Sequence, residues 1–425
     1  MYLHKSKLIN IVINILVLTI LFSVVYFSTL QGLYRVDPHH WGLMLSSAKD
    51  FVDGKIPYKD IYNIYGLLTT IIHSIAYKFL GENFSALMKV TALFYAVGLW
   101  VIFKISFRIT NDHILALYVL ITCVLIHPVA IYPWSNYIAF PFLMGGIFYL
   151  LSNENNKLFF LLSGFLMSLA ALSREGLTLI VGLIIFLFLL VELIYKKENL
   201  KIEIRKFTYV GIGFVSPIFL FAIYLYYKNI VKYWILLSVD LPKAYALGQF
   251  PHMSSRSFLK PLLLEFKNNL VTLDIRWTII CLMSATLLIG LCLTIFKFKN
   301  IDDQKIKIIK ISLASIALFA TALHIPEIFR IATGSIIGII VLFYWAKSLR
   351  LDGYLFIILT IPLILTLFKT NSGNPFYPEK KQFEDTVYIT KPSAIRSQLW
   401  PIGMQNYYVD FQEKFKKKLE ELQGI

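Results

Sequence analysis

The chain has 425 residues, of which 57% are hydrophobic and only 16% are charged, and its formal net charge is +16. A soluble domain of this length carries about a quarter charged residues, so the composition argues against a soluble protein. A soluble protein this basic would suggest a nucleic-acid partner. In a chain with long apolar runs, an uneven distribution of positive charge across a membrane explains the excess better. We therefore expect a multi-pass membrane protein that binds no nucleic acid.

The apolar runs predict the fold class. A bilayer core of about 30 Å needs about 20 mostly apolar residues per helix. We expect about eleven transmembrane helices, near residues 8–30, 86–107, 114–131, 136–152, 158–172, 176–195, 207–227, 275–296, 308–323, 334–346 and 353–369. The fold is thus all-α and polytopic, with a transmembrane domain over 1–369. An external C-terminal tail with an amphipathic helix is expected over 370–425.

Segment 62–80 decides which loops face the cytoplasm. Loops 196–206 and 297–310 each have a net charge of +3, and cytoplasmic loops favour lysine and arginine. Both loops fall on the side of the basic N-terminus only if segment 62–80 does not cross. Its polar residues, among them Thr70, His73 and Ser74, share one helical face, which favours an amphipathic helix at the interface. A crossing helix that turns this polar face to a cavity stays the alternative.

This placement predicts the sidedness of the chain. The N-terminus is expected in the cytoplasm and the active side outside the cell membrane. Two long external loops follow, over residues 31–88 and 228–274. In the first, Asp37 and Pro38 are expected to open a short helix that Gly54 closes, because Asp is a good N-cap and Pro suits the first helical position.

Three motifs carry a resemblance to a known family. The first loop has an acidic residue, then Gly-x-x-Pro-Tyr-x-Asp over 54–60, then a helix led by Tyr-Gly and ended by Phe-Leu-Gly. The second motif is GFLMSLAALSREGLTLIVG over 164–182, and the third is HIPEIFRIATGSIIGIIVL over 324–342. Together they resemble the GT-C superfamily of membrane glycosyltransferases, which includes protein O-mannosyltransferases and the lipid A aminoarabinose transferase. Many relatives carry Asp-Glu where this chain has Asp37-Pro38.

The resemblance implies an activity and its partners. Such enzymes transfer a sugar, usually with inversion, from a polyprenyl-phosphate donor to a glycan, lipid or protein acceptor outside the cytoplasm. The chemistry needs a carboxylate to take the acceptor's proton and cations to stabilise the leaving phosphate. The implied catalytic acids are Asp37 and Asp60. The implied phosphate contacts are Arg174, Arg330 and Lys59, and the supporting or acceptor-binding residues are His39, His40, Glu175 and Arg256.

Each of these residues also has a plainer interpretation. Asp37 could be only an N-cap and Asp60 only a turn residue. Arg174 with Glu175 could be an interfacial anchor, and Arg330 could extend its charge to the membrane surface. No cofactor is firmly indicated. A divalent metal held by Asp37, Asp60 and the adjacent histidines is an option, although His-His-Trp at an interface is more often structural.

Two other classes of protein stay open. A polysaccharide polymerase or ligase also places a charged loop outside, usually late in the chain. A lipid or glycan flippase or another transporter would need ionisable residues buried at mid-membrane. The sequence has no P-loop, dinucleotide fingerprint or nucleophile elbow, which argues against an ATP-driven pump and a hydrolase.

Overall fold

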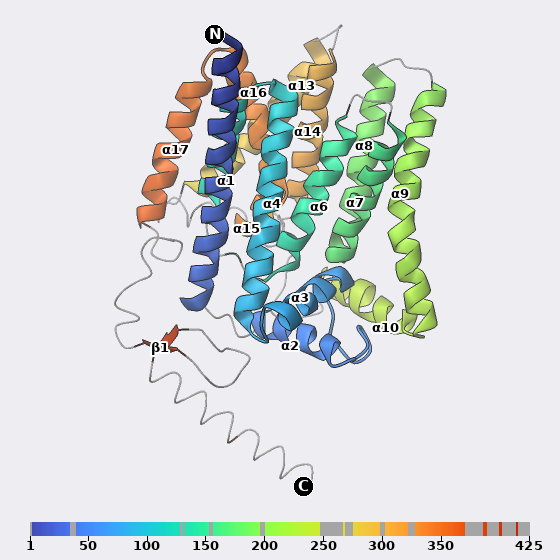
Figure 1. The fold of residues 1–425 in the computed structure, drawn as a ribbon. Coiled ribbons are helices and arrows are strands. Elements are labelled where there is room, and N and C mark those ends of the chain that lie inside the picture. Colours follow the sequence, from blue (N-terminus) through green and yellow to red (C-terminus); the bar gives the residue numbers. More distant parts are fainter. Residues whose placement is uncertain are drawn as a thin grey trace.

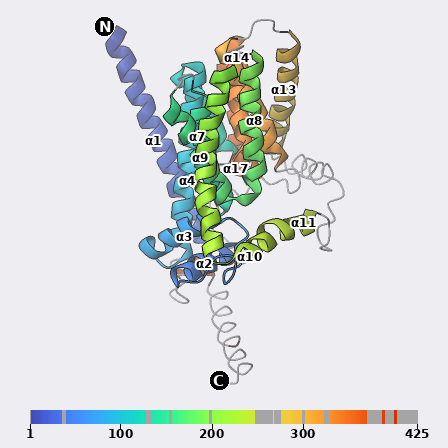
Figure 2. The same cartoon turned by 90° about the vertical axis from the view of Figure 1, so that its right-hand side faces the viewer.

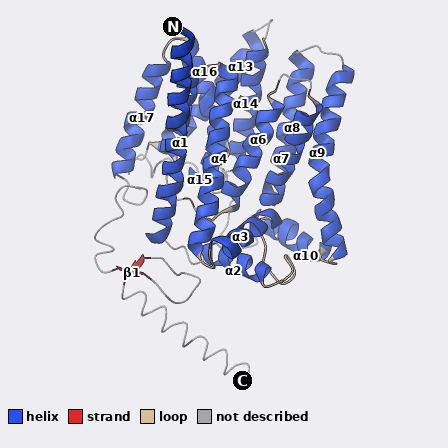
Figure 3. Ribbon diagram, in the orientation of Figure 1, coloured by secondary structure: helices blue, strands red, loops and turns tan. Residues whose placement is uncertain are grey.

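The computed structural model describes residues 2–34, 40–127, 131, 133–152, 156–195, 200–246, 267, 275–297, 302–321, 328–369, 386–388, 399–401 and 414. Most of them are helical (Figures 1 and 3). The long helices form one bundle that consists of α1 (Tyr2–Tyr34), α4 (Phe84–Thr110), α5 (His113–Ile126), α6 (Ser135–Leu150), α7 (Lys157–Ser173), α8 (Thr178–Tyr195), α9 (Leu200–Tyr227), α13 (Arg276–Lys297), α14 (Asp303–Ala320), α16 (Ile339–Ser348) and α17 (Asp352–Lys369).

Four helices among the described residues are long and apolar enough to cross a membrane, over Ile9–Leu30, Phe84–Thr110, Glu175–Tyr195 and Ile204–Tyr227. Shorter apolar helices include His113–Ile126, Ser135–Leu150 and Lys157–Ser173. The mostly helical structure and these four helices agree with the predicted class. The number of eleven crossings stays a prediction.

Three helices lie across one end of the bundle, away from the N-terminus. They are α2 (His40–Val52), α3 (Leu67–Leu80) and α10 (Val231–Ile235), and both views show them below the long helices (Figures 1 and 2). The segment 62–80 therefore does not run along the bundle. Gly54 follows α2 with a φ of 86°, so the expected glycine stop after this helix is present.

The polar face of α3 packs against the protein and its apolar face points outward. His73 and Ser74 are buried. His73 Nε2 lies 3.2 Å from Thr91 Oγ1, and Ser74 Oγ donates to the Ala48 carbonyl oxygen at 3.1 Å. Phe79, by contrast, is 74% exposed. An exposed apolar face and a buried, hydrogen-bonded polar face are what a helix resting on lipid beside a polar protein needs.

The second predicted external loop, 228–274, contains helical segments that the sequence pattern did not indicate. Helix α10 continues without a break into a π-helical turn, η2 (Leu236–Asp240), and then into α11 (Leu241–Ala246). Pro242 lies inside this continuous helical segment, two residues after the π-helical turn ends. Apart from Lys267, residues 247–274 lie outside the described part.

The two basic loops are shorter than predicted. α9 begins at Leu200 and α14 at Asp303. Lys206 and Lys310 are therefore helical, and both are buried beside Glu192 of α8. The ends that join α8 to α9 and α13 to α14 lie at the same end of the bundle as the N-terminus of α1 (Figure 1). This arrangement agrees with the side that the charge count assigns to them.

The C-terminal segment 370–425 is described at few positions. A two-stranded antiparallel ribbon pairs β1 (Thr386–Tyr388) with β2 (Leu399–Pro401), with Val387 opposite Trp400. The sequence analysis did not predict these strands. The predicted amphipathic helix lies outside the described residues.

Candidate functional site

The site is built around the sharp turn between α7 and α8. α7 ends at Ser173, Arg174 has extended backbone angles, and a 3-10 turn, η1 (Glu175–Leu177), leads into α8. This turn lies at the end of the bundle where α3 crosses (Figure 1). Thr69 Oγ1 donates to the Ser173 carbonyl oxygen at 2.7 Å. The first turn of α3 is thereby fixed to the backbone next to Arg174.

Gly66 makes this close approach possible. Its φ is 96°, in the region that side chains rarely adopt, and a Cβ there would lie 2.5 Å from the Ser173 carbonyl oxygen. Only a residue without a Cβ fits both requirements. The Tyr-Gly pair that leads α3 thus serves as a contact point on the Arg174 turn.

A second cation lies close to Arg174. Arg330, on the short helix α15 (Ile328–Ala332), is close enough to repel it electrostatically, and Tyr65 lies nearby. Burial and this repulsion lower the pKa of Arg174 to about 9, so the guanidinium stays charged at neutral pH. Among the described residues, no carboxylate forms an ion pair with Arg174. Two cations that face one another are more stable when an anion lies between them.

Arg330 is held by a polar connection to α6. Thr333 Oγ1 donates to the Arg330 carbonyl oxygen at 3.4 Å, and Asn136 Nδ2 lies 3.5 Å from Thr333 Oγ1. Arg330 itself keeps some exposed surface. The turn after α15 then enters a 3-10 segment, η3 (Ser335–Gly338), whose residues are buried. The backbone that carries Arg330 is therefore held by the packed interior of the bundle.

Glu175 does not pair with its neighbour Arg174. The Tyr58 hydroxyl donates a hydrogen bond to Glu175 Oε1, across 117 positions of sequence. Ser238 and Trp234 lie beside the same carboxylate. Tyr58 is 3% exposed, and its burial and the nearby Glu175 raise its pKa well above the usual value, so it stays a donor. Two segments that are distant in sequence, one with Tyr58 and one with Trp234 and Ser238, thus meet at the Glu175 carboxylate.

Tyr58 has a strained backbone. Its φ is 67°, which is unusual for a bulky residue. The ring packs near Phe221 of α9, at 6.2 Å between ring centres. Strain of this kind persists only where the surroundings enforce it, and it gathers at functional sites.

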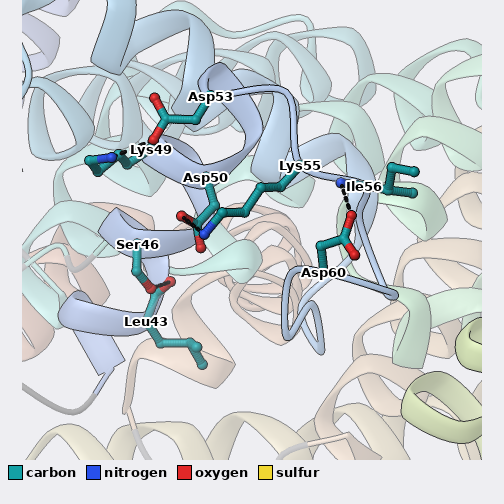
Figure 4. A network of polar contacts seen from close by, with 8 residues as sticks. All are labelled: Leu43, Ser46, Lys49, Asp50, Asp53, Lys55, Ile56 and Asp60. Carbon is teal, nitrogen blue, oxygen red and sulfur yellow. Dashed lines mark hydrogen bonds and ion pairs between the residues drawn. The ribbon is translucent and has the colours of Figure 1, made fainter. Parts of the chain in front are cut away.

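Lys59 and Asp60 directly follow Tyr58 in the turn 57–60 (Figure 4 shows Asp60). Both are exposed, and Asp60 Oδ2 accepts a hydrogen bond from the Ile56 backbone N–H at 3.0 Å. Nearby, Lys55 pairs with Asp50 at 2.8 Å, and Lys49 pairs with Asp53. Asp60 thus makes the contact expected of a turn residue. The geometry shows no contact of Lys59 or Asp60 with Arg174 or Arg330.

Several predicted site residues lie outside the described part of the structure. Asp37, His39 and Arg256 are among them, and so is the side chain of His40, at whose position α2 begins. In the ranges that are described, no group of three or more His, Cys, Asp and Glu side chains is arranged to hold a metal ion. The predicted base and the optional metal site therefore stay predictions.

Two groups of aromatic and polar contacts could not be predicted from the sequence pattern, and one of them includes Tyr65, the neighbour of Arg174. Tyr65 and Trp134 rings lie 4.8 Å apart between their centres. His127 Nε2 lies 2.7 Å from the Tyr137 hydroxyl, and Arg276 at the start of α13 is close to this histidine. Nothing in the local sequence distinguishes these residues from ordinary aromatic and polar residues of a bundle.

Comparison with known proteins gives no name to this arrangement. The sequence matches no family model and no curated protein. The fold and the site define a helical protein with apolar helices of membrane-spanning length and two partly buried arginines close to one another. The resemblance to GT-C enzymes rests on the motifs alone.

Proposed function

We propose that this protein is a membrane glycosyltransferase that takes a sugar from a polyprenyl-phosphate donor. The observation that carries the proposal is that Arg330 lies close enough to Arg174 to repel it, while no carboxylate among the described residues forms an ion pair with Arg174. Arginine is the side chain best suited to bind phosphate oxygens in pairs of hydrogen bonds. Both arginines belong to the motifs that resemble the GT-C family.

The reaction assigns a task to each group. The acceptor hydroxyl attacks the anomeric carbon, the bond from that carbon to the phosphate oxygen breaks, and polyprenyl phosphate leaves. The negative charge that grows on the phosphate is stabilised by Arg174 and Arg330. The hydroxyl proton passes to a carboxylate, for which Asp37 remains our candidate. The acceptor is a glycan, lipid or protein, and the apolar helices supply a surface for the prenyl chain.

The location of the pair supports an active site outside the cytoplasm. Arg174 belongs to the turn between α7 and α8, which is hydrogen-bonded to α3. That end of the bundle, which carries α2, α3 and α10, lies opposite the N-terminus of α1 (Figure 1). The exposed apolar face of α3 is suited to rest on lipid at that end. A lipid-linked donor in the outer leaflet of the cell membrane would meet the protein there.

A transfer assay tests the proposal. Purified protein in lipid vesicles is given labelled polyprenyl-phosphate sugars and a crude acceptor extract. We expect transfer by the natural protein, and a loss of at least about 100-fold in Arg174→Gln and in Arg330→Gln, since removal of one charge-stabilising donor costs about that much. Arg205→Gln, an exposed arginine at the opposite end of the bundle, is the matched control and keeps full activity.

Two outcomes of this assay would contradict the proposal. One is full transfer in both variants, which would remove the cation pair from the chemistry. The other is activity only with diphosphate-linked oligosaccharides, which would favour the polymerase or ligase class.

One observation favours the transporter class. Glu192, Lys206 and Lys310 form a buried ionic cluster, and such residues inside a membrane often mark an ion or substrate path. Movement of a labelled polyprenyl-phosphate sugar across vesicles without any covalent change would support that class instead.

A further inference from the structure

Glu175 directly follows Arg174 in the chain, yet the two side chains form no ion pair in the described structure. Instead, the carboxylate accepts the hydrogen bond of Tyr58, and the donors Ser238 and Trp234 lie beside it. Among the described residues, the buried Ser238 Oγ and Trp234 Nε1 atoms have no hydrogen-bond partner of normal geometry. A small movement of the carboxylate or of these side chains would complete both bonds.

The segments that supply these donors are both unusual in their backbone. Tyr58 has a φ of 67° and is buried, whereas Lys59 and Asp60, which follow it, are exposed. Ser238 belongs to the π-helical turn η2. Isolated π-turns within α-helices occur often at functional sites. Two irregular backbone segments, from separate parts of the chain, therefore converge on one carboxylate.

If the Glu175 carboxylate lost these donors, Arg174 would be an alternative partner for it. The Arg174 guanidinium is the adjacent side chain and has no carboxylate partner among the described residues. An ion pair between them would be strong in a partly buried site, and it would occupy the cation. An incoming anion would then have to displace Glu175.

We propose that Tyr58, together with Ser238 and Trp234, holds Glu175 away from Arg174 and so keeps this guanidinium available for an anionic ligand. Tyr58 is a positioning residue that acts on the anion site through Glu175. The outer turn 57–60 and the helical segment 231–246 thereby control how strongly the anion binds. Only the identity of the anion, the phosphate of a polyprenyl lipid, rests on the proposed function.

Lipid binding tests the inference first. The protein in nanodiscs is titrated with a polyprenyl phosphate and with the uncharged polyprenol of equal length. We expect the natural protein to prefer the phosphate and Arg174→Gln to lose the preference. Tyr58→Phe weakens phosphate binding about tenfold, since hydrogen bonds to charged groups contribute enough for that change. Glu175→Gln keeps the preference, because no carboxylate then competes for Arg174.

The double variant separates positioning from simple structural support. On the Glu175→Gln background, Tyr58→Phe leaves phosphate binding unchanged. Tyr226→Phe, which removes the hydroxyl of an 82% exposed tyrosine of α9, is the matched control and behaves like the natural protein. Loss of the phosphate preference in folded Glu175→Gln, or equal weakening by Tyr58→Phe on both backgrounds, would overturn the inference.

A second measurement needs no lipid. The shift in thermal unfolding midpoint caused by Glu175→Gln is expected to be the same with and without Arg174→Gln when Tyr58 is present. In the Tyr58→Phe background, the shift depends on Arg174, because the released carboxylate now pairs with it. If the natural protein shows no phosphate preference while this dependence appears, the proposed function is wrong and the positioning role stands. If the preference is present and the dependence is absent, the positioning role is wrong.

Discussion

Gly66 shows how one residue fixes the geometry of the site. The backbone of this glycine lies against the carbonyl oxygens of Leu172 and Ser173, directly before Arg174. A methyl group there would push α3 away from the turn. The hydrogen bond from Thr69 to Ser173 would lengthen with it. The distance between α3 and the turn that carries Arg174 therefore depends on the absence of a side chain at Gly66.

Gly66→Ala is expected to lower the free energy of unfolding by about 1–3 kcal/mol, the usual cost of a strained backbone position. It should also weaken phosphate binding, because Arg174 moves with the turn. Unfolding in bicelles and the lipid titration measure the two effects. Gly42→Ala is the control, since nothing lies within 4 Å of a Cβ at that position. An unchanged unfolding curve for Gly66→Ala would show that the close contact is absent.

Some residues of the candidate site could be predicted from the sequence. Arg174, Glu175 and Arg330 stood out because charged residues at membrane boundaries are costly and often functional. Their contacts were not predictable: pairing of Glu175 with Arg174 was only the alternative interpretation, and in the structure Glu175 contacts Tyr58. A bond across 117 positions depends on tertiary packing, which no local pattern encodes. For Asp60, the plainer interpretation as a turn residue matches the contact that the structure describes.

The helices α8, α9 and α14 are joined by one buried ionic cluster. Lys206 Nζ lies 3.2 Å from Glu192 Oε2, and Lys310 contacts Oε1 of the same carboxylate. The side chains of Lys206 and Glu192 are 8% and 9% exposed, and that of Lys310 is 3% exposed. One acid shared by two buried lysines holds three helices in register.

Glu192→Gln is expected to lower the free energy of unfolding by about 3–5 kcal/mol, since it removes the carboxylate that two buried lysines contact. Unfolding in bicelles measures the loss. Lys49→Gln, in the exposed pair with Asp53, is the control and changes stability little because water screens that pair. A Glu192→Gln protein as stable as the natural one would mean that water reaches the cluster.

Prediction of the elements succeeded where the hydrophobic pattern was clear. The helical segment 62–80 was expected to have a polar and an apolar face, and α3 has both, with the apolar face exposed. The charge count treated every lysine of 196–206 and 297–310 as solvated, so it could not predict the burial of Lys206 and Lys310. The helix 231–246 was missed because Asp240 and Pro242 interrupt a short apolar run, which resembles a loop in sequence.

The whole molecule has two different ends. One end carries the N-terminus of α1, the end of α8 and the start of α9, where Arg205 and Lys206 lie. The other end carries α2, α3 and α10 beside Arg174 (Figures 1 and 2). Positive charge favours the cytoplasmic side of a membrane, so we propose that the end with Arg174 faces outward.

Cysteine labelling in intact cells tests this orientation. In a protein without native cysteines, Lys59→Cys is expected to react with a membrane-impermeant maleimide. Arg205→Cys should react only after the cells are permeabilised. Both residues are exposed in the structure. The reverse pattern would place Arg174 on the cytoplasmic side, where an extracytoplasmic transferase could not use it.

Photocrosslinking tests the central claim most directly. A polyprenyl phosphate with a photoreactive group next to the phosphate is irradiated with the protein in nanodiscs, and the attached peptides are mapped by mass spectrometry. We predict attachment to the segments around Tyr65, Arg174 and Arg330, and its loss in Arg174→Gln. Attachment only to the opposite end of the bundle, or equal labelling by the uncharged polyprenol analogue, would contradict a donor phosphate site at these arginines.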